Sequence, residues 1–121
     1  MEALGLPFSE AVRVGDILFL SGQLGVEPGT TDLVQGGIAA EAKQALENVR
    51  SILERNGSSI DRVVKCTVFL ADIDDWPELN EVYSQYFLST RPARSALAAS
   101  GLALGARVEI ECIAVVDDTP R

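Results

Sequence analysis

The sequence predicts an α+β fold in which one mixed β-sheet carries two helices on one face. Two short strand-like runs precede the first helix-like segment, a β-branched run separates it from the second, and two more strand-like runs follow. The predicted order is therefore β-β-α-β-α-β-β, with the helices and the sheet sharing one core. The chain of 121 residues is expected to form a single domain, residues 1–121.

The first two strands are predicted at residues 11–14 and 17–21, on either side of the turn Gly15-Asp16. The second run is almost continuously apolar, which favours a strand covered on both faces. The stretch "VEPGTTDLVQGG" that follows is rich in proline, glycine, threonine and aspartate, so we expect a loop there.

The first helix is predicted from Ile38 to Asn56, because apolar residues recur at every third or fourth position with charged residues between them. Asn56-Gly57 is typical of a helix end, since glycine readily adopts the left-handed conformation that stops a helix.

The second helix is predicted to begin within "DIDDWPEL" and to end by Leu88 or Ser89. Asp75 and Glu78 have the spacing of a capping box at its start. Pro77 fits the first turn, where its missing N–H would have no helical partner.

The remaining strands are predicted in "RVVKCTVFLAD", "ARSALAAS" and "RVEIECIAVV". Helices on one face of the sheet leave the other face to be covered by something else. Because the strands are rich in apolar residues, we expect subunits to associate through that second face.

Composition excludes several functional classes. The formal net charge is −8, whereas nucleic-acid binding needs a basic surface. No apolar run is long enough for a membrane span, so a soluble, cytoplasmic protein is expected. The chain contains no histidine, which excludes imidazole-based triads and the HExxH zinc site. Cys66 and Cys112 lie in strand-like runs and are expected to be free, buried thiols rather than a disulfide or metal ligands.

Arg94 and the glutamates of the last strand are the strongest candidates for chemistry. Arg94 follows Pro92 at the start of a strand, and its planar guanidinium matches a carboxylate with two parallel hydrogen bonds. The strand period of two places Glu109 and Glu111 on one face together with Arg107. The two glutamates are also consistent with the solvated face of an edge strand, or with ion pairs to Arg107 and a neighbouring lysine, and Arg94 is consistent with an internal salt bridge to either glutamate.

The segments "ILFLSGQLG", "VVKCTVFLADIDDWPELNEVYSQYF" and "RPARSALAASGLALGARVEIECIAVV" closely resemble the RidA/YjgF-like family of reactive intermediate deaminases. The resemblance runs from about Phe8 to Val116 and includes the "PARS" and "VEIE" motifs. It implies a chorismate-mutase-like subunit that assembles as a homotrimer around a central barrel, with ligand clefts between subunits. It also implies hydrolysis of 2-imino or 2-enamino acids, such as 2-aminoacrylate and 2-iminobutanoate, to 2-oxo acids and ammonia, without metal or organic cofactor.

The same resemblance assigns roles to residues of this chain. Arg94 of "PARS" would clamp the substrate carboxylate, and Glu109 of "VEIE" would hold the attacking water and move protons. The residues expected to line the cleft as substrate contacts are Phe8, Ser21, Gly22, Asn80 and Arg94. Phe8 stands where many members of the family carry a tyrosine, so the ring is kept and the hydroxyl is lost. For this reason a second hypothesis stays open, a non-catalytic trimer that binds small carboxylates such as 2-oxo acids, or a protein partner, through the same cleft.

Overall fold

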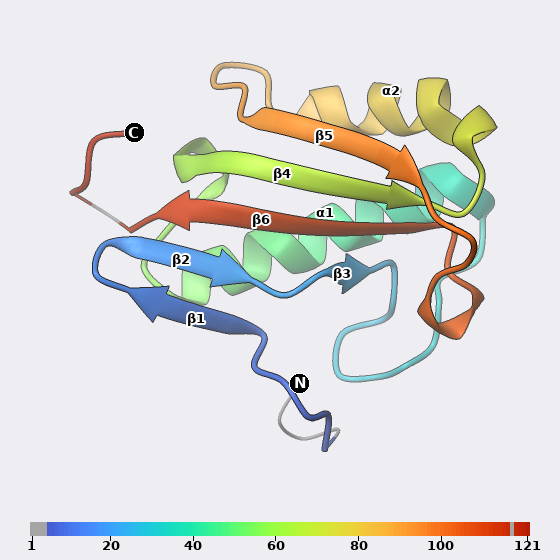
Figure 1. Ribbon diagram of the computed structural model, residues 1–121, viewed down its shortest axis with the longest axis horizontal. Helices are drawn as coiled ribbons and strands as arrows, with labels where there is room; N and C mark the ends of the chain where they lie inside the picture. The colour runs from blue at the N-terminus through green and yellow to red at the C-terminus, as the bar shows by residue number, and fades with distance from the viewer. Residues whose placement is uncertain (1–4, 117) are drawn as a thin grey trace.

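Five strands lie side by side in the computed structural model, which describes residues 5–116 and 118–121 (Figure 1). Their order across the sheet is β1 (Ala11–Val14), β2 (Ile17–Leu20), β6 (Val108–Val115), β4 (Val63–Leu70) and β5 (Ala93–Ala98). Only β4 and β5 are parallel neighbours, so the predicted mixed sheet is confirmed. The strand that comes last in the sequence occupies the middle of the sheet.

A sixth strand, β3 (Gln23–Leu24), pairs with the early part of β6. It is not among the predicted strands, because two residues are too few for an alternating pattern to be recognised. It matters for function because it fixes the chain just after "SGQ" against the "VEIE" segment.

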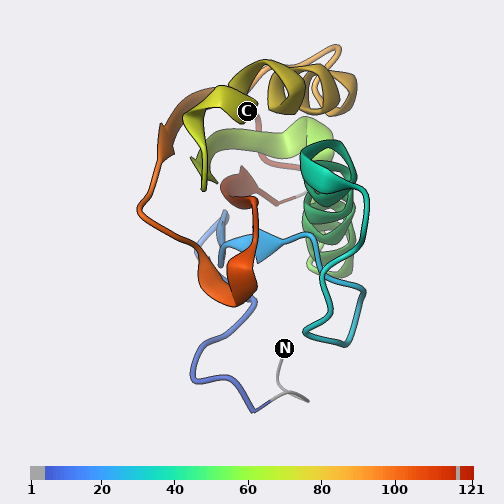
Figure 2. The same cartoon turned by 90° about the vertical axis from the view of Figure 1, so that its right-hand side faces the viewer.

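Helices α1 (Gly37–Arg55) and α2 (Trp76–Tyr86) cover the same face of the sheet, as predicted (Figure 2). The core lies between them and this face, and the inward side chains of β4 and β6 are fully buried. The end of α1 is the predicted one: Gly57 has a φ of 76°, and the Ser58 N–H donates to the Leu53 carbonyl at 2.8 Å. This is the hydrogen bond that terminates a helix with glycine in the left-handed conformation.

The predicted capping box at the start of α2 is wrong. Asp75 has helical backbone angles and its side chain caps nothing, because a 3₁₀ turn (Ile73–Asp75) already leads into the helix. A capping side chain normally belongs to a residue in the extended region, and Asp72 is that residue here. Its carboxylate accepts a hydrogen bond from the Asp74 N–H at 2.9 Å.

Cys66 and Cys112 face each other across β4 and β6 inside the core, with their sulfur atoms 3.1 Å apart. Both are free thiols, as predicted. The hydrogen bond between them lowers the pKa of Cys66 and raises that of Cys112. The two thiols are thus joined by one hydrogen bond, in which either sulfur can be the donor.

The other face of the sheet carries an apolar surface that no described part of the chain covers. We call it the open-face patch, and it comprises Val12, Val14, Ile17 and Phe19, all at least 42% exposed. The cross-strand pairs Val12–Phe19 and Val14–Ile17 place all four on one side of β1 and β2. Neither helix in the described ranges combines the length and apolar character that crossing a membrane requires.

Candidate functional site

Arg94 lies on the helix-covered face of the sheet, near its edge. It pairs with the buried Cys66 across the parallel strands β4 and β5, which directs its side chain toward α2. The guanidinium carbon is 4.7 Å from the centre of the Tyr83 ring and 5.1 Å from that of Trp76. It forms no hydrogen bond or ion pair with any residue in the described ranges. Its donor groups are therefore available to a ligand.

Helix α2 carries two further polar groups on the side that contacts this arginine. Trp76, Asn80 and Tyr83 are spaced by four and then three residues, which brings them to one face of the helix. Among described groups, the Asn80 amide oxygen and the Tyr83 hydroxyl are buried without a hydrogen-bond partner. Burial raises the pKa of Tyr83, so its hydroxyl stays neutral. Unpartnered buried polar atoms are rare in proteins, and here they belong to the helix face whose Trp76 and Tyr83 rings contact Arg94.

Glu109 lies on the opposite, open face of the sheet, as the strand period predicts. Pairing of β3 with β6 sets Gly22 against its side chain, and a Cβ atom added to Gly22 would overlap Glu109 Oε2 and lie 2.8 Å from Cδ. Gly22 is thus the residue that leaves room for the carboxylate. Burial raises the pKa of Glu109, and the charge of Glu111 on the same face raises it further.

Ser21 directly precedes Gly22, and hydrogen bonds join it to the segment that follows Phe8. The Ser21 hydroxyl donates to the Ser9 carbonyl oxygen at 2.6 Å, and the Ser21 N–H donates to the Glu10 carbonyl oxygen at 3.0 Å. Ser21 therefore ties the N-terminal segment to the end of β2, and its hydroxyl oxygen can still accept a hydrogen bond. Phe8, next to Ser9, is 47% exposed.

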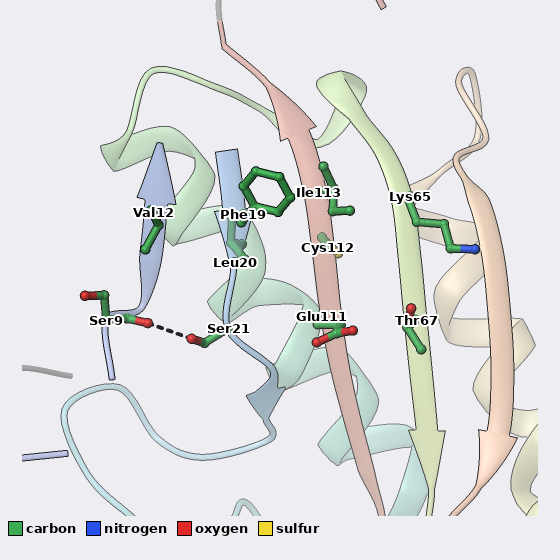
Figure 3. Close-up of a pocket in the computed structure, with 10 residues that line it drawn as sticks. All are labelled: Ser9, Val12, Phe19, Leu20, Ser21, Lys65, Thr67, Glu111, Cys112 and Ile113. Carbon is green, nitrogen blue, oxygen red and sulfur yellow. Dashed lines mark hydrogen bonds between the residues drawn. The ribbon is translucent and has the colours of Figure 1, made fainter. Parts of the chain in front are cut away.

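A cavity of about 370 Å³ opens on the same face of the sheet (Figure 3). Glu111 and Thr67 lie side by side at its centre, and Phe19, Val12 and Ile113 form an apolar wall. Of the predicted site residues only Ser21 lines it; Arg94 and Glu109 do not. The cavity is a hollow in the open face rather than a complete site.

The structure does not bring Arg94 and Glu109 together within one chain. They point to opposite faces of the sheet, on strands separated by β4. Along β4, Arg94 is level with Cys66 and Glu109 with Phe69, which separates them by roughly 10 Å in the strand direction. The site residues therefore form two groups, one around Arg94 with Asn80 and one around Glu109 with Gly22 and Ser21.

The ion pairs considered for these residues do not form among the described residues. Arg107 pairs with Glu41 instead: its Nε lies 3.6 Å from Glu41 Oε2, and its backbone N–H donates to Glu41 Oε1 at 2.9 Å. An internal salt bridge between Arg94 and either glutamate is likewise wrong, since they lie on different faces.

A family model described as "Endoribonuclease L-PSP" matches residues 2–116. The chain belongs to this family. It is the RidA/YjgF-like family that the motifs resemble, and the predicted fold class is confirmed with it.

Several RidA/YjgF-like relatives are named for an activity. The bovine and human proteins named 2-iminobutanoate/2-iminopropanoate deaminase are 52% and 49% identical to this chain over 109 residues, which are 90% of this chain and 80% of each relative. Among solved structures, Escherichia coli TdcF with bound serine is 36% identical and superposes with a TM-score of 0.85, covering 91% of this chain and 88% of TdcF.

No group of three or more cysteine, aspartate and glutamate side chains that could hold a metal ion occurs in the described part of this RidA/YjgF-like chain. Two residues beside Arg94, Trp76 and Tyr83, are not among the predicted site residues. Tyr83 lies on the inward stripe of α2 and is buried in the core, so its position alone does not indicate a site. The spacing of Trp76, Asn80 and Tyr83 on one helix face is the signal that would have grouped both aromatic residues with the cleft.

Proposed function

We propose that this chain hydrolyses 2-imino acids to 2-oxo acids and ammonia, at sites formed between chains of an oligomer. Membership of the RidA/YjgF-like family and the shared name of its mammalian relatives support the imine deaminase activity. The observation that carries the proposal is that the N–H groups of the Arg94 guanidinium bond to no carboxylate among the described residues, although the chain has 18 acidic residues. A free guanidinium fork of this kind suits a small carboxylate.

In the proposed complex, Arg94 binds the substrate carboxylate through two parallel hydrogen bonds. The Asn80 amide oxygen, buried and without a partner, accepts a hydrogen bond from the imine nitrogen. These two contacts recognise the two groups that define a 2-imino acid. They also hold the imine carbon in a fixed position for attack, which is where much of the rate increase in such a reaction arises.

Glu109 is proposed to act on water. Its carboxylate accepts a proton from the water as the water oxygen bonds to the carbon of the protonated imine, which gives a neutral tetrahedral carbinolamine. The same group returns that proton to the amino nitrogen, the carbon–nitrogen bond breaks, and the departing ammonia takes the hydroxyl proton as the carbonyl forms, so that the products are the 2-oxo acid and ammonium. The raised pKa of Glu109 supports both steps, because a carboxyl group that ionises closer to neutrality can accept and donate a proton.

The separation of Arg94 and Glu109 supports a site made by two chains. A small substrate cannot contact both sides of one sheet, so the arginine group of one subunit must meet the glutamate group of its neighbour. The open-face patch gives the subunits an apolar surface through which to associate. We propose the homotrimer that the family resemblance implies.

The test is turnover of imines generated in solution from amino acids by an amino-acid oxidase or a lyase, with loss of the imine followed over time. Arg94→Ala is expected to lower kcat/KM by about 100-fold or more, since a charge-assisted bidentate contact is lost. Glu109→Gln is expected to lower kcat while the variant still binds 2-oxobutanoate. Equal rates for the wild type and Arg94→Ala would overturn the proposal.

The alternative function, a non-catalytic trimer that binds small carboxylates, is favoured by one observation. Phe8 offers an exposed ring without the hydroxyl that the family resemblance leads us to expect there. Binding of 2-oxobutanoate by the wild type without any acceleration of imine loss would establish this alternative. The family description also mentions an endoribonuclease, but a net charge of −8 opposes the electrostatic attraction to phosphates on which RNA binding depends, and we do not propose that activity.

A further inference from the structure

We propose that Trp76 and Tyr83 are positioning residues that hold the Arg94 guanidinium in place by cation–π contacts and leave its hydrogen-bond donors free for the ligand. The inference rests on the proposed function, because it explains how the carboxylate clamp is held. The inference gives a role to two aromatic residues that are not among the predicted site residues.

The two rings contact the guanidinium at distances typical of cation–π interactions. The separations of 4.7 and 5.1 Å are both within the roughly 6 Å over which a ring attracts a cation. Both rings come from α2, whereas Arg94 comes from β5, so the contact joins two elements that follow each other in the chain. Tyr83 is buried and Trp76 is 37% exposed, so the arginine lies between the core and the edge of the site.

The other arginines of the chain show why this arrangement is distinctive. Within the part of the chain that the structure describes, four of them form ion pairs with carboxylates: Arg13, Arg50, Arg55 and Arg107. A carboxylate partner neutralises the charge and occupies the guanidinium fork. Aromatic faces attract the cation without doing either, since they contact the plane of the group rather than its N–H edge. Arg94 is therefore fixed in position while its binding capacity is preserved.

Arg50 provides a matched control within the same protein. Its guanidinium lies 5.1 Å from the centre of the Tyr86 ring, a separation equal to that between Arg94 and Trp76. However, Arg50 also donates to Glu47 at 3.2 Å, so its fork is already used. Removing the Tyr86 ring should therefore disturb a cation–π contact of the same length without changing ligand binding.

The first experiment measures binding of sodium 2-oxobutanoate by calorimetry to the assembled protein. We expect Trp76→Leu to weaken binding about three- to thirty-fold, the range of a cation–π contact in a partly buried setting. Trp76→Phe keeps an aromatic face and should stay within about threefold of the wild type. Tyr83→Phe should likewise retain binding, because the ring and not the hydroxyl makes the contact. Tyr86→Leu should bind like the wild type.

A second readout uses the fact that Trp76 is the single tryptophan of the chain. When a carboxylate neutralises the guanidinium beside the indole, the tryptophan emission should change during the titration. Arg94→Ala should abolish this change, whereas Tyr86→Leu should preserve it. In imine turnover, Trp76→Leu should raise KM and leave kcat close to the wild-type value, because the contact acts on carboxylate binding in the ground state and the transition state alike.

The outcomes separate this inference from the proposed function. If Arg94→Ala abolishes binding but Trp76→Leu binds as tightly as the wild type, the positioning role is wrong and the carboxylate clamp stands. Equal weakening by Trp76→Phe and Trp76→Leu would also overturn the role, since an aromatic face would then be insufficient. If Arg94→Ala binds 2-oxobutanoate normally, the clamp itself is wrong.

Discussion

The two faces of the sheet hold their functional charges in different ways. On the helix-covered face, Arg94 is half-buried among aromatic side chains and forms no ion pair with a carboxylate of residues 5–116 or 118–121. On the open face, Glu109 and Glu111 lie two residues apart, and burial together with the charge of Glu111 raises the pKa of Glu109. The fold thus keeps the positive charge of Arg94 apart from the negative charge of Glu109, so the two do not neutralise each other. Both remain available to a ligand only because the sheet lies between them.

The most demanding test of this comparison mixes two inactive variants. Arg94→Ala keeps Glu109, and Glu109→Gln keeps Arg94, so a site between chains is complete where an arginine of the second variant faces a glutamate of the first. Random assembly of equal amounts should restore roughly one quarter of wild-type activity, because each site needs one particular chain on each side. The measurement is imine turnover after the chains have been unfolded and refolded together.

Separately refolded variants that are combined afterwards serve as the control and should stay inactive. Failure of the co-refolded mixture to exceed that background would show that both residues act within one chain.

A second test places a charge on the open-face patch. Phe19→Asp should prevent subunits from associating, because a carboxylate would have to be buried without a partner. We expect the single-chain mass by light scattering and at least about a tenfold fall in activity, with helical circular dichroism unchanged since the core lies on the other face. Retention of the oligomer would place the subunit interface elsewhere.

A third test compares two glycines near β3. Gly22→Ala should displace the Glu109 carboxylate and lower kcat by about tenfold to a hundredfold, the cost of misplacing a catalytic group by about 1 Å. Its thermal stability should change little, because the atoms it would meet belong to the end of a flexible side chain. The measurements are kcat and the melting temperature.

Gly25→Ala is the matched control. A Cβ there would lie 2.5 Å from the Glu41 backbone oxygen and 2.6 Å from its Cα, which belong to α1 and cannot move independently. The free energy of unfolding should fall by about 1–3 kcal/mol. If Gly22→Ala lost stability to the same extent with unchanged kcat, Gly22 would be a packing residue and not part of the site.

The smallest expected effect concerns pH. The negative charge of Glu111 opposes ionisation of Glu109 and so raises its pKa. Glu111→Gln should therefore lower that pKa and move the acid limb of the kcat profile to lower pH, since ionised Glu109 is the active form. A limb that moves to higher pH, or that does not move, would contradict the assigned base. The basic limb of the profile is the internal reference.

Much of the fold could be predicted from local patterns. The helix-like spacing from Ile38 to Asn56 and the alternation around Glu109 are properties of neighbouring residues, and both are confirmed. The position of Arg94 relative to Glu109 could not be predicted, because it depends on which strands pair. Sequence order places the two strands next to each other, whereas β4 lies between them in the sheet. The contacts of Arg94 with the Trp76 and Tyr83 rings, which leave its N–H groups free, are tertiary contacts, and composition does not reveal them.

The central position of β6 has a consequence for how the molecule folds. Until β6 joins, the sheet consists of two separate pieces, β1 with β2 and β4 with β5, each with an unpaired edge. The β4-α2-β5 piece contains Arg94 and both of its aromatic contacts, so this part of the site can form during synthesis before the last strand leaves the ribosome. The Glu109 part forms only when the two ends of the chain meet. A nascent or truncated chain lacking β6 would expose the strand edges that β6 covers, and it should aggregate readily. Pairing of the C-terminal strand is therefore the step that commits the chain to its native state.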